Sequence, residues 1–150
     1  MSELVRGSSV PLFDKLSSTE SRVSAGAFLL LPEQLEASIA TELTRLFNTR
    51  SRLRPSQYRE STGTVIDYGI PDFSALSPRR GEDRELLESA LTGAVSAFEP
   101  RMTNVAVKVA PVPERGDAAI VTVSGDVVIG LKPQRMSFAL NLNPSQTGAT

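Results

Sequence analysis

The chain has 150 residues, of which 40% are apolar and 22% charged, and its formal net charge is −1. This composition is that of one ordinary globular domain, and so small a charge gives no gross attraction to nucleic acid or anionic lipid. Cysteine and histidine are both absent, which excludes disulfides, thiolate metal sites, the Ser-His-Asp triad and the commonest zinc ligand. Carboxylates, hydroxyls, Lys and Tyr remain for chemistry, so catalysis is disfavoured, and we predict no cofactor and no metal site.

Residues 1–25 are rich in serine and carry a small apolar group at Leu12, Phe13 and Leu16. We predict a mobile N-terminal arm here, followed by one domain over residues 26–150. The longest apolar run, at 27–31, holds five residues, far short of the ~20 that a membrane-spanning helix needs. No apolar stretch of signal-peptide length occurs near the start. The sequence therefore predicts a cytoplasmic protein without direct membrane insertion.

Two main helices are predicted by apolar residues at helical spacing. The first begins at Pro32, whose missing N–H has no cost at a helix start, and ends near Asn48. The second runs from about Glu82 to Phe98. Their apolar stripes are Leu35, Ile39, Leu43, Leu46 and Phe47 in the first and Leu87, Leu91, Ala94, Val95 and Phe98 in the second. Prolines and glycines make residues 55–81 loop-like, with one short strand around Val65 and Ile66.

The remaining sequence predicts strands, because apolar residues recur with a period of two. The alternation covers residues 105–110, 119–131 and 136–143. The connections at 111–117 and 132–134 are short enough to join antiparallel neighbours. The predicted fold is α+β, with two main helices packed on the apolar face of a small antiparallel β-meander.

The second helix ends in Glu99, Pro100 and Arg101. Pro100 stops the helix, because a proline disfavours helical geometry for the residue before it. An acid at the negative end of a helix dipole is mildly destabilising, so helix stability does not explain Glu99. We interpret the motif as a paired or partner-facing site; the alternative is a helix stop with two solvated charges.

A second candidate site is basic. Five arginines and no acid lie between Leu43 and Arg59. Guanidinium groups suit carboxylates and phosphates alike, and the alternative is a solvated helix end. Apart from Tyr58, no aromatic residue outside the predicted core interleaves these charges, which counts against nucleic acid as the partner.

Four segments in order resemble the TssE-like proteins of type VI secretion baseplates and the related wedge proteins of contractile phage tails. They are PLFDKLS at residues 11–17, LTRLFNTRSRL at 43–53, VIDYGIPDFSALS at 65–77 and AFEPRMTNV at 97–105. Order and spacing agree with the family over residues 11–143. The first helix departs from it at Ala40 and Thr41, where relatives often carry Arg-Asp.

The resemblance implies a structural subunit of a multi-subunit baseplate next to the inner membrane, and not an enzyme. It implies TssF and TssG wedge subunits as neighbours, and the TssB–TssC sheath as the structure that assembles on the sheet. A free edge of the last predicted strand would then template the sheath by main-chain hydrogen bonds. The residues that we expect to bind partners are Glu99, Pro100, Arg101, Asn48, Arg50 and Arg52.

Three alternatives stay open. The protein could be a wedge protein of a contractile phage tail, or an adaptor that binds a cytoplasmic regulator through the same fold. The wider family has also been labelled lysozyme-like, and a retaining glycosidase needs two carboxyls about 5–5.5 Å apart, one of them with a raised pKa. The acids in patterned segments are Glu99, Asp67 and Asp72. Arg101 beside Glu99 makes this acid a poor proton donor, and tryptophan is absent, so hydrolysis is disfavoured.

Overall fold

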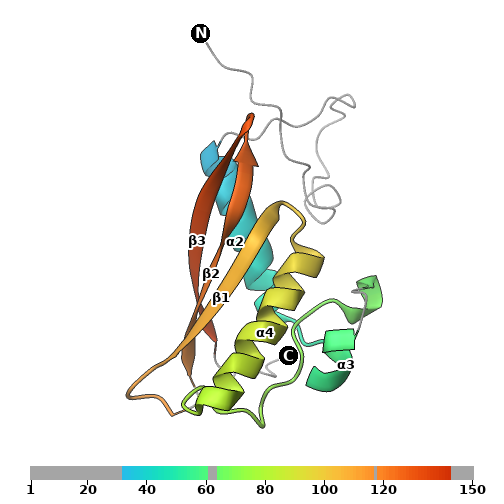
Figure 1. Ribbon diagram of the computed structural model, residues 1–150, viewed down its shortest axis with the longest axis vertical. Helices are drawn as coiled ribbons and strands as arrows, with labels where there is room; N and C mark the ends of the chain where they lie inside the picture. The colour runs from blue at the N-terminus through green and yellow to red at the C-terminus, as the bar shows by residue number, and fades with distance from the viewer. Residues whose placement is uncertain (1–31, 61–63, 117, 143–150) are drawn as a thin grey trace, which may run out of the picture.

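The structure is a computed structural model that describes residues 32–60, 64–116 and 118–142. The predicted N-terminal arm over residues 1–25 and the domain boundary after it lie outside the described residues. The elements in chain order are helix α2 (Pro32–Asn48), helix α3 (Pro55–Glu60), the 3-10 turn η1 (Val65–Asp67), helix α4 (Gly81–Phe98), and strands β1 (Met102–Pro111), β2 (Ala119–Ile129) and β3 (Lys132–Leu142). The strands form an antiparallel sheet in the order β1-β2-β3 (Figure 1), which confirms the predicted α+β class.

The two main helices form where their apolar spacing predicts them. α2 begins at Pro32 with Glu33 in its first turn, and α4 carries Glu82 and Asp83 in its first turn. These carboxylates favour the positive end of each helix dipole. Phe98 is only half-buried, and the buried residues are Leu35, Ile39, Leu43, Leu46 and Phe47 in α2 and Leu87, Ala90, Leu91, Ala94 and Val95 in α4.

The sheet has one buried and one open face. In β2, Ala119, Val121, Val123, Gly125 and Val127 are buried, as the alternation predicts. The side chains between them point to the opposite face, where Ile120 and Val128 are exposed. Strand pairing keeps this alternation in register across the sheet, since Val121 lies opposite both Val109 of β1 and Leu140 of β3. One face is therefore available to the helices, and the other faces outward.

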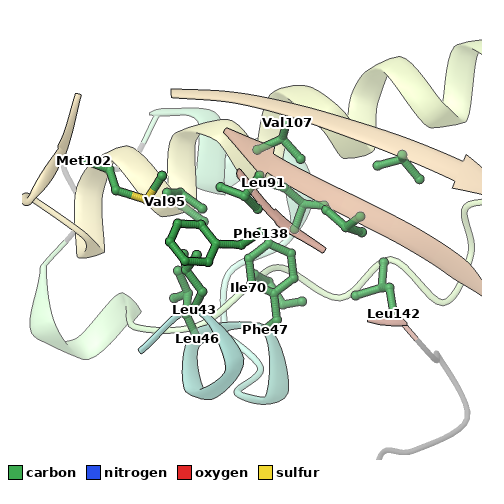
Figure 2. Close-up of a cluster of buried hydrophobic side chains, with 14 of the residues drawn as sticks. Leu43, Leu46, Phe47, Ile70, Leu91, Val95, Met102, Val107, Phe138 and Leu142 are labelled. Atoms are coloured by element: carbon green, nitrogen blue, oxygen red, sulfur yellow. The ribbon is translucent and has the colours of Figure 1, made fainter. Parts of the chain in front are cut away.

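α2 and α4 both pack on the buried face, and a single core forms between them and the sheet. Figure 2 shows its centre, where the labelled side chains come from both helices, from β1 and β3, and from the loop before α4: Leu43, Leu46, Phe47, Ile70, Leu91, Val95, Met102, Val107, Phe138 and Leu142. Ile70 is fully buried although it belongs to no helix or strand. Burial of such a side chain stabilises the fold by about 1.5–3 kcal/mol, so the loop is part of the core.

The strand predicted at Val65 and Ile66 is wrong. These residues form the 3-10 turn η1, with side chains that are 91% and 83% exposed. The Asp67 carboxylate accepts hydrogen bonds from the N–H and the hydroxyl of Thr64, which closes the turn locally. The predicted loop 55–81 also contains helix α3, which begins at Pro55.

The connection predicted at residues 132–134 is also wrong. β3 already begins at Lys132, and the turn from β2 consists of Gly130 and Leu131. Gly130 has φ 66, the left-handed conformation that a two-residue hairpin turn requires. Pro133 pairs with Val128 inside the ladder. A strand accepts proline there because β3 lies at the edge of the sheet.

Gly69 lies where the loop after η1 crosses the chain after α2. The N–H of Ser51 donates to the Ile70 carbonyl at 2.8 Å, and the N–H of Ile70 donates to the Thr49 carbonyl at 2.9 Å. Gly69 has φ +118, and a Cβ on it would lie 2.6 Å from the Thr49 oxygen and 2.8 Å from the Ser51 nitrogen. The two backbones approach as closely as they do because the crossing residue has no side chain.

We predict that Gly69→Ala lowers the free energy of unfolding by about 1–3 kcal/mol, because both the positive φ and the close approach become strained. Gly93→Ala is the matched control. Gly93 lies in α4 with nothing within 4 Å of an added Cβ, so this change should raise stability by about 0.5–1 kcal/mol. Urea denaturation followed by circular dichroism measures both. Equal stability of the two variants would contradict a steric role for the crossing.

Candidate functional site

The motif that ends α4 folds back on itself. The N–H of Glu99 still donates to the Val95 carbonyl at 2.8 Å, and the N–H of Met102 donates to the Glu99 carbonyl at 3.1 Å. Pro100 lies exposed at the corner between helix and strand. This tight turn brings the Arg101 side chain back over the Glu99 carboxylate.

Glu99 and Arg101 form a bidentate ion pair. The guanidinium Nε donates to Oε1 at 2.7 Å and Nη2 donates to Oε2 at 2.6 Å, while the Arg101 backbone N–H donates to Oε1 at 3.2 Å. The two side chains are only 4% and 6% exposed. Two parallel charge-assisted bonds are the arrangement that best compensates the loss of water around both charges.

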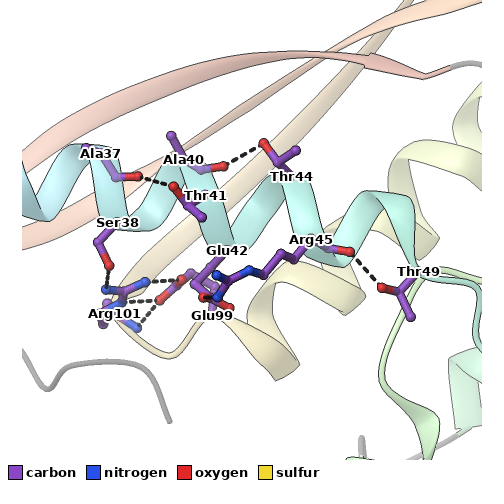
Figure 3. Close-up of polar contacts among 10 residues, drawn as sticks. All are labelled: Ala37, Ser38, Ala40, Thr41, Glu42, Thr44, Arg45, Thr49, Glu99 and Arg101. Atoms are coloured by element: carbon purple, nitrogen blue, oxygen red, sulfur yellow. Dashed lines mark hydrogen bonds and ion pairs between the residues drawn. The ribbon is translucent and has the colours of Figure 1, made fainter. Parts of the chain in front are cut away.

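The same guanidinium reaches α2. Its Nη1 donates to the Ser38 hydroxyl at 3.0 Å, so the ion pair joins the end of α4 and the start of β1 to α2 (Figure 3). We call Ser38, Glu99 and Arg101 the polar clamp. The structure thus shows Glu99 paired, as the sequence predicts, and the partner is Arg101 of the same chain. Binding of a partner by these two buried side chains stays a prediction, whereas Pro100 is exposed.

The face of α2 that carries Thr41 and Thr44 makes local polar contacts. The Thr41 hydroxyl donates to the Ala37 carbonyl at 2.9 Å, and the Thr44 hydroxyl donates to the Ala40 carbonyl at 2.8 Å (Figure 3). Such bonds return to the same helix one turn earlier. The two hydroxyls are therefore already satisfied within α2.

The predicted basic site divides between the interior and the surface. Asn48 and Arg52 are exposed. Arg50 is instead half-buried, with its guanidinium carbon 4.5 Å from the centroid of the Phe73 ring, a cation–π contact. Burial lowers the pKa of Arg50, and this effect outweighs the negative charge of Asp72, which by itself would raise the pKa. Its Nη1 is buried without a hydrogen-bond partner among the described residues.

Two tyrosines, Tyr58 and Tyr68, hold the loop that crosses the chain at Gly69. The Tyr58 hydroxyl donates to the Gly69 carbonyl at 2.7 Å. Burial, with a further contribution from the charge of Asp67, raises the pKa of Tyr58 to about 12. The Tyr68 ring meets the Phe98 ring edge-on at 5.2 Å. The loop is thereby fixed to α3 on one side and to the end of α4 on the other.

The direction of the backbone groups in the sheet follows from one contact. The Val109 N–H donates to a side chain of α4 at 3.0 Å, so it faces away from β2. The N–H and C=O of alternate residues point to opposite sides of a strand. Val121, opposite Val109, therefore faces β3, and Leu140 faces β2.

β3 consequently presents an open edge. Its outward backbone groups belong to Arg135, Ser137, Ala139 and Asn141, and to Pro133, which has no N–H. Over residues 32–60, 64–116 and 118–142, no hydrogen bond is found from these four outward N–H groups. An edge with free donors and acceptors can pair with a further strand.

Glu99 and Asp72, two of the acids considered for hydrolysis, are both held in hydrogen bonds. Both oxygens of Glu99 already accept bonds from Arg101. Hydrogen bonds from Ser74 hold the pKa of Asp72 below its usual range, whereas a catalytic proton donor needs a raised pKa. No group of three acids suited to a metal ion occurs in the described part of the chain. None of the helices described is long and apolar enough to cross a membrane.

Comparison with known proteins gives one family match. The model of the family described as baseplate wedge protein gp25 matches residues 33–130, which contain both main helices, β1 and β2. No curated protein matches the sequence. Among solved structures, a chain of "The baseplate complex from the type VI secretion system" is 18% identical, with a TM-score of 0.49 over 74% of this chain and 96% of that chain.

We predict that Glu99→Ala or Arg101→Ala alone lowers the free energy of unfolding by about 3–5 kcal/mol, because each leaves an uncompensated buried charge. The double variant Glu99→Leu with Arg101→Met should be less destabilised than either single variant, since no buried charge remains. Urea denaturation provides the measurement.

Arg135→Ala is the control for this prediction. Arg135 pairs with Asp126 at 3.2 Å, but its side chain is 54% exposed, so its loss should change stability by less than about 1 kcal/mol. If the single clamp variants unfold like this control, the ion pair has no structural role.

Proposed function

Since the chain belongs to the baseplate wedge protein gp25 family, we propose that it is the TssE-like subunit that links the wedge complex of a type VI secretion baseplate to the sheath. Family membership makes it a structural component of a multi-subunit baseplate. The proposal goes further by naming TssF and TssG as wedge neighbours and the TssB–TssC sheath as the structure that starts on this chain. It places the protein in the cytoplasm, at a baseplate next to the inner membrane.

The open edge of β3 is the observation that carries the sheath part of the proposal. Three successive outward positions, Ser137, Ala139 and Asn141, have backbone groups that face away from β2. Their inward neighbours Phe138 and Leu142 are buried in the core, which fixes the register of the strand. A strand held this firmly offers a neighbour a fixed ladder of donors and acceptors, and a sheath subunit that adds one strand would start with a defined orientation.

The wedge part of the proposal rests on the surface near the end of α2. Asn48 and Arg52 are exposed there, and Arg50 between them is anchored by its bridge to Ile70 and by Phe73. Exposed arginines on a fixed backbone suit carboxylates of a partner subunit. In this proposal the polar clamp holds the end of α4 against α2 at Ser38, and Pro100 adds an exposed contact.

We predict that Arg52→Ala leaves the fold unchanged but weakens recovery of the wedge subunits by about fivefold, the effect of an interface residue worth ~1 kcal/mol. Asn48→Ala should act in the same direction. The assay is a pull-down of the tagged full chain from cells that produce the wedge proteins. Arg115→Ala, an exposed arginine on the β1–β2 connection, is the control and should recover them normally. Undiminished recovery with both Asn48→Ala and Arg52→Ala would remove this surface from the proposal.

A second prediction concerns the sheath. Proline at Ser137, Ala139 or Asn141 removes one outward donor and leaves every inward apolar side chain in place. Each variant should remain soluble and enter the wedge, but sheath filaments, seen by fluorescence microscopy of a labelled sheath subunit, should be absent.

The matched control is Ala139→Thr, which keeps the N–H and suits a strand; it should assemble sheaths. Normal filaments with all three proline variants would show that the sheath does not pair with β3. The arginine-rich segment 45–59 would then be the next surface to test.

A further inference from the structure

β1 is the other edge strand of the sheet, and its edge differs from that of β3. A row of free backbone groups at an edge can pair with any extended chain, including a second copy of the same protein. A subunit that templates strand addition at one edge must therefore prevent it at the other. α4 lies alongside β1 (Figure 1), and one of its side chains reaches the backbone of this strand.

That side chain is Glu88. Its Oε1 accepts the outward N–H of Val109 at 3.0 Å, and its Oε2 accepts a hydrogen bond from the Lys108 ammonium at 3.2 Å. Burial by itself would raise the pKa of Glu88, but the bonds from Val109 and Lys108 outweigh it and hold the pKa below the usual range. The carboxylate is thus an ionised acceptor in the place where the carbonyl of a fourth strand would bind.

The rest of the β1 edge offers little to a neighbour. The pairing with β2 shifts between Thr103 and Ala106, and Asn104 there has φ 49, so a bulge interrupts the ladder. Pro111 lies opposite Ala119 in the same outward phase as Val109, and proline has no N–H. Val107 is then the remaining outward donor between the bulge and the proline, and one donor is too few to hold a strand.

We propose that Glu88 caps the β1 edge, so that a strand from a sheath subunit or from a second copy of this chain can add at β3 only. The identity of the strand at β3 rests on the proposed function, but closure of β1 does not. Lys108 is a positioning residue in this device, because it holds the second oxygen of the carboxylate.

Hydrogen exchange of the Val109 amide, measured by NMR on the full chain, tests the cap directly. Glu88→Gln keeps an oxygen that can accept the bond, and Glu88→Ala does not. Lys108→Ala removes the ion pair but leaves the acceptor. Exchange at Val109 should accelerate about tenfold or more in Glu88→Ala, and by less than about threefold in Glu88→Gln and Lys108→Ala. Equal protection in Glu88→Ala and Glu88→Gln, or an unprotected amide in the wild type, would overturn the proposal.

Self-association tests the consequence. The variants are compared in the Ala139→Pro background, where β3 is blocked. Sedimentation velocity should show Glu88→Ala associating at about tenfold lower concentration than Glu88→Gln. The reason is that the Val109 N–H, freed in Glu88→Ala, can form one more hydrogen bond to the strand of a second copy. Ser137→Pro provides the same background if circular dichroism shows that Ala139→Pro is unfolded. Equal association of the two Glu88 variants would show that β1 needs no cap. Neither measurement involves a baseplate, so its failure and failure of the sheath proposal are distinguishable.

Discussion

The buried ion pair between Glu99 and Arg101 fixes the point where helix becomes sheet. α4 ends at Phe98 with Glu99 as its C-cap, and β1 begins at Met102. Arg101, just before β1, is bonded to Ser38 on α2. Taking two charges out of water costs several kcal/mol per ion, and the pair offsets this only because its geometry is bidentate. The bond from Arg101 to Ser38 ties this corner of the chain to α2 as well. The core in Figure 2 lies between the same two helices and the sheet.

The sheet that starts at this clamp has two unlike edges. At β1, a carboxylate accepts one outward N–H, and a bulge and a proline interrupt the row of the others. At β3, the four outward N–H groups from Arg135 to Asn141 have no partner among the described residues. An isolated protein gains solubility from closing its edges, and an assembly subunit needs one edge open. The two edges therefore differ, and the proposed start of sheath assembly would use this difference, because strand addition would be restricted to one edge.

The crossing of the chain at Gly69 ties the surface beside the end of α2 to the core. It carries the bridge from Arg50 to Ile70, and Ile70 is fully buried in the core. The exposed Arg52 therefore extends from a backbone that is tied to the core on both sides of the crossing. A preorganised contact loses less entropy on binding than a flexible one, which is the advantage such a surface would have for a partner with carboxylates.

The sequence by itself determined both main helices, three strands and the α+β class, because the spacing of Leu35 to Phe47, of Leu87 to Val95 and of the alternating valines depends only on neighbours along the chain. It also indicated that Glu99 needs a partner, since the helix dipole opposes an acid at that position. It did not reveal that Arg50 turns inward, that Val65 and Ile66 form an exposed turn, or that β3 begins before Pro133. Nor did it reveal the bonds from Arg101 to Ser38 and from Val109 to Glu88, which join residues 63 and 21 positions apart. Those outcomes were decided by tertiary structure, because they depend on which elements the packed core brings side by side, and no local spacing records that.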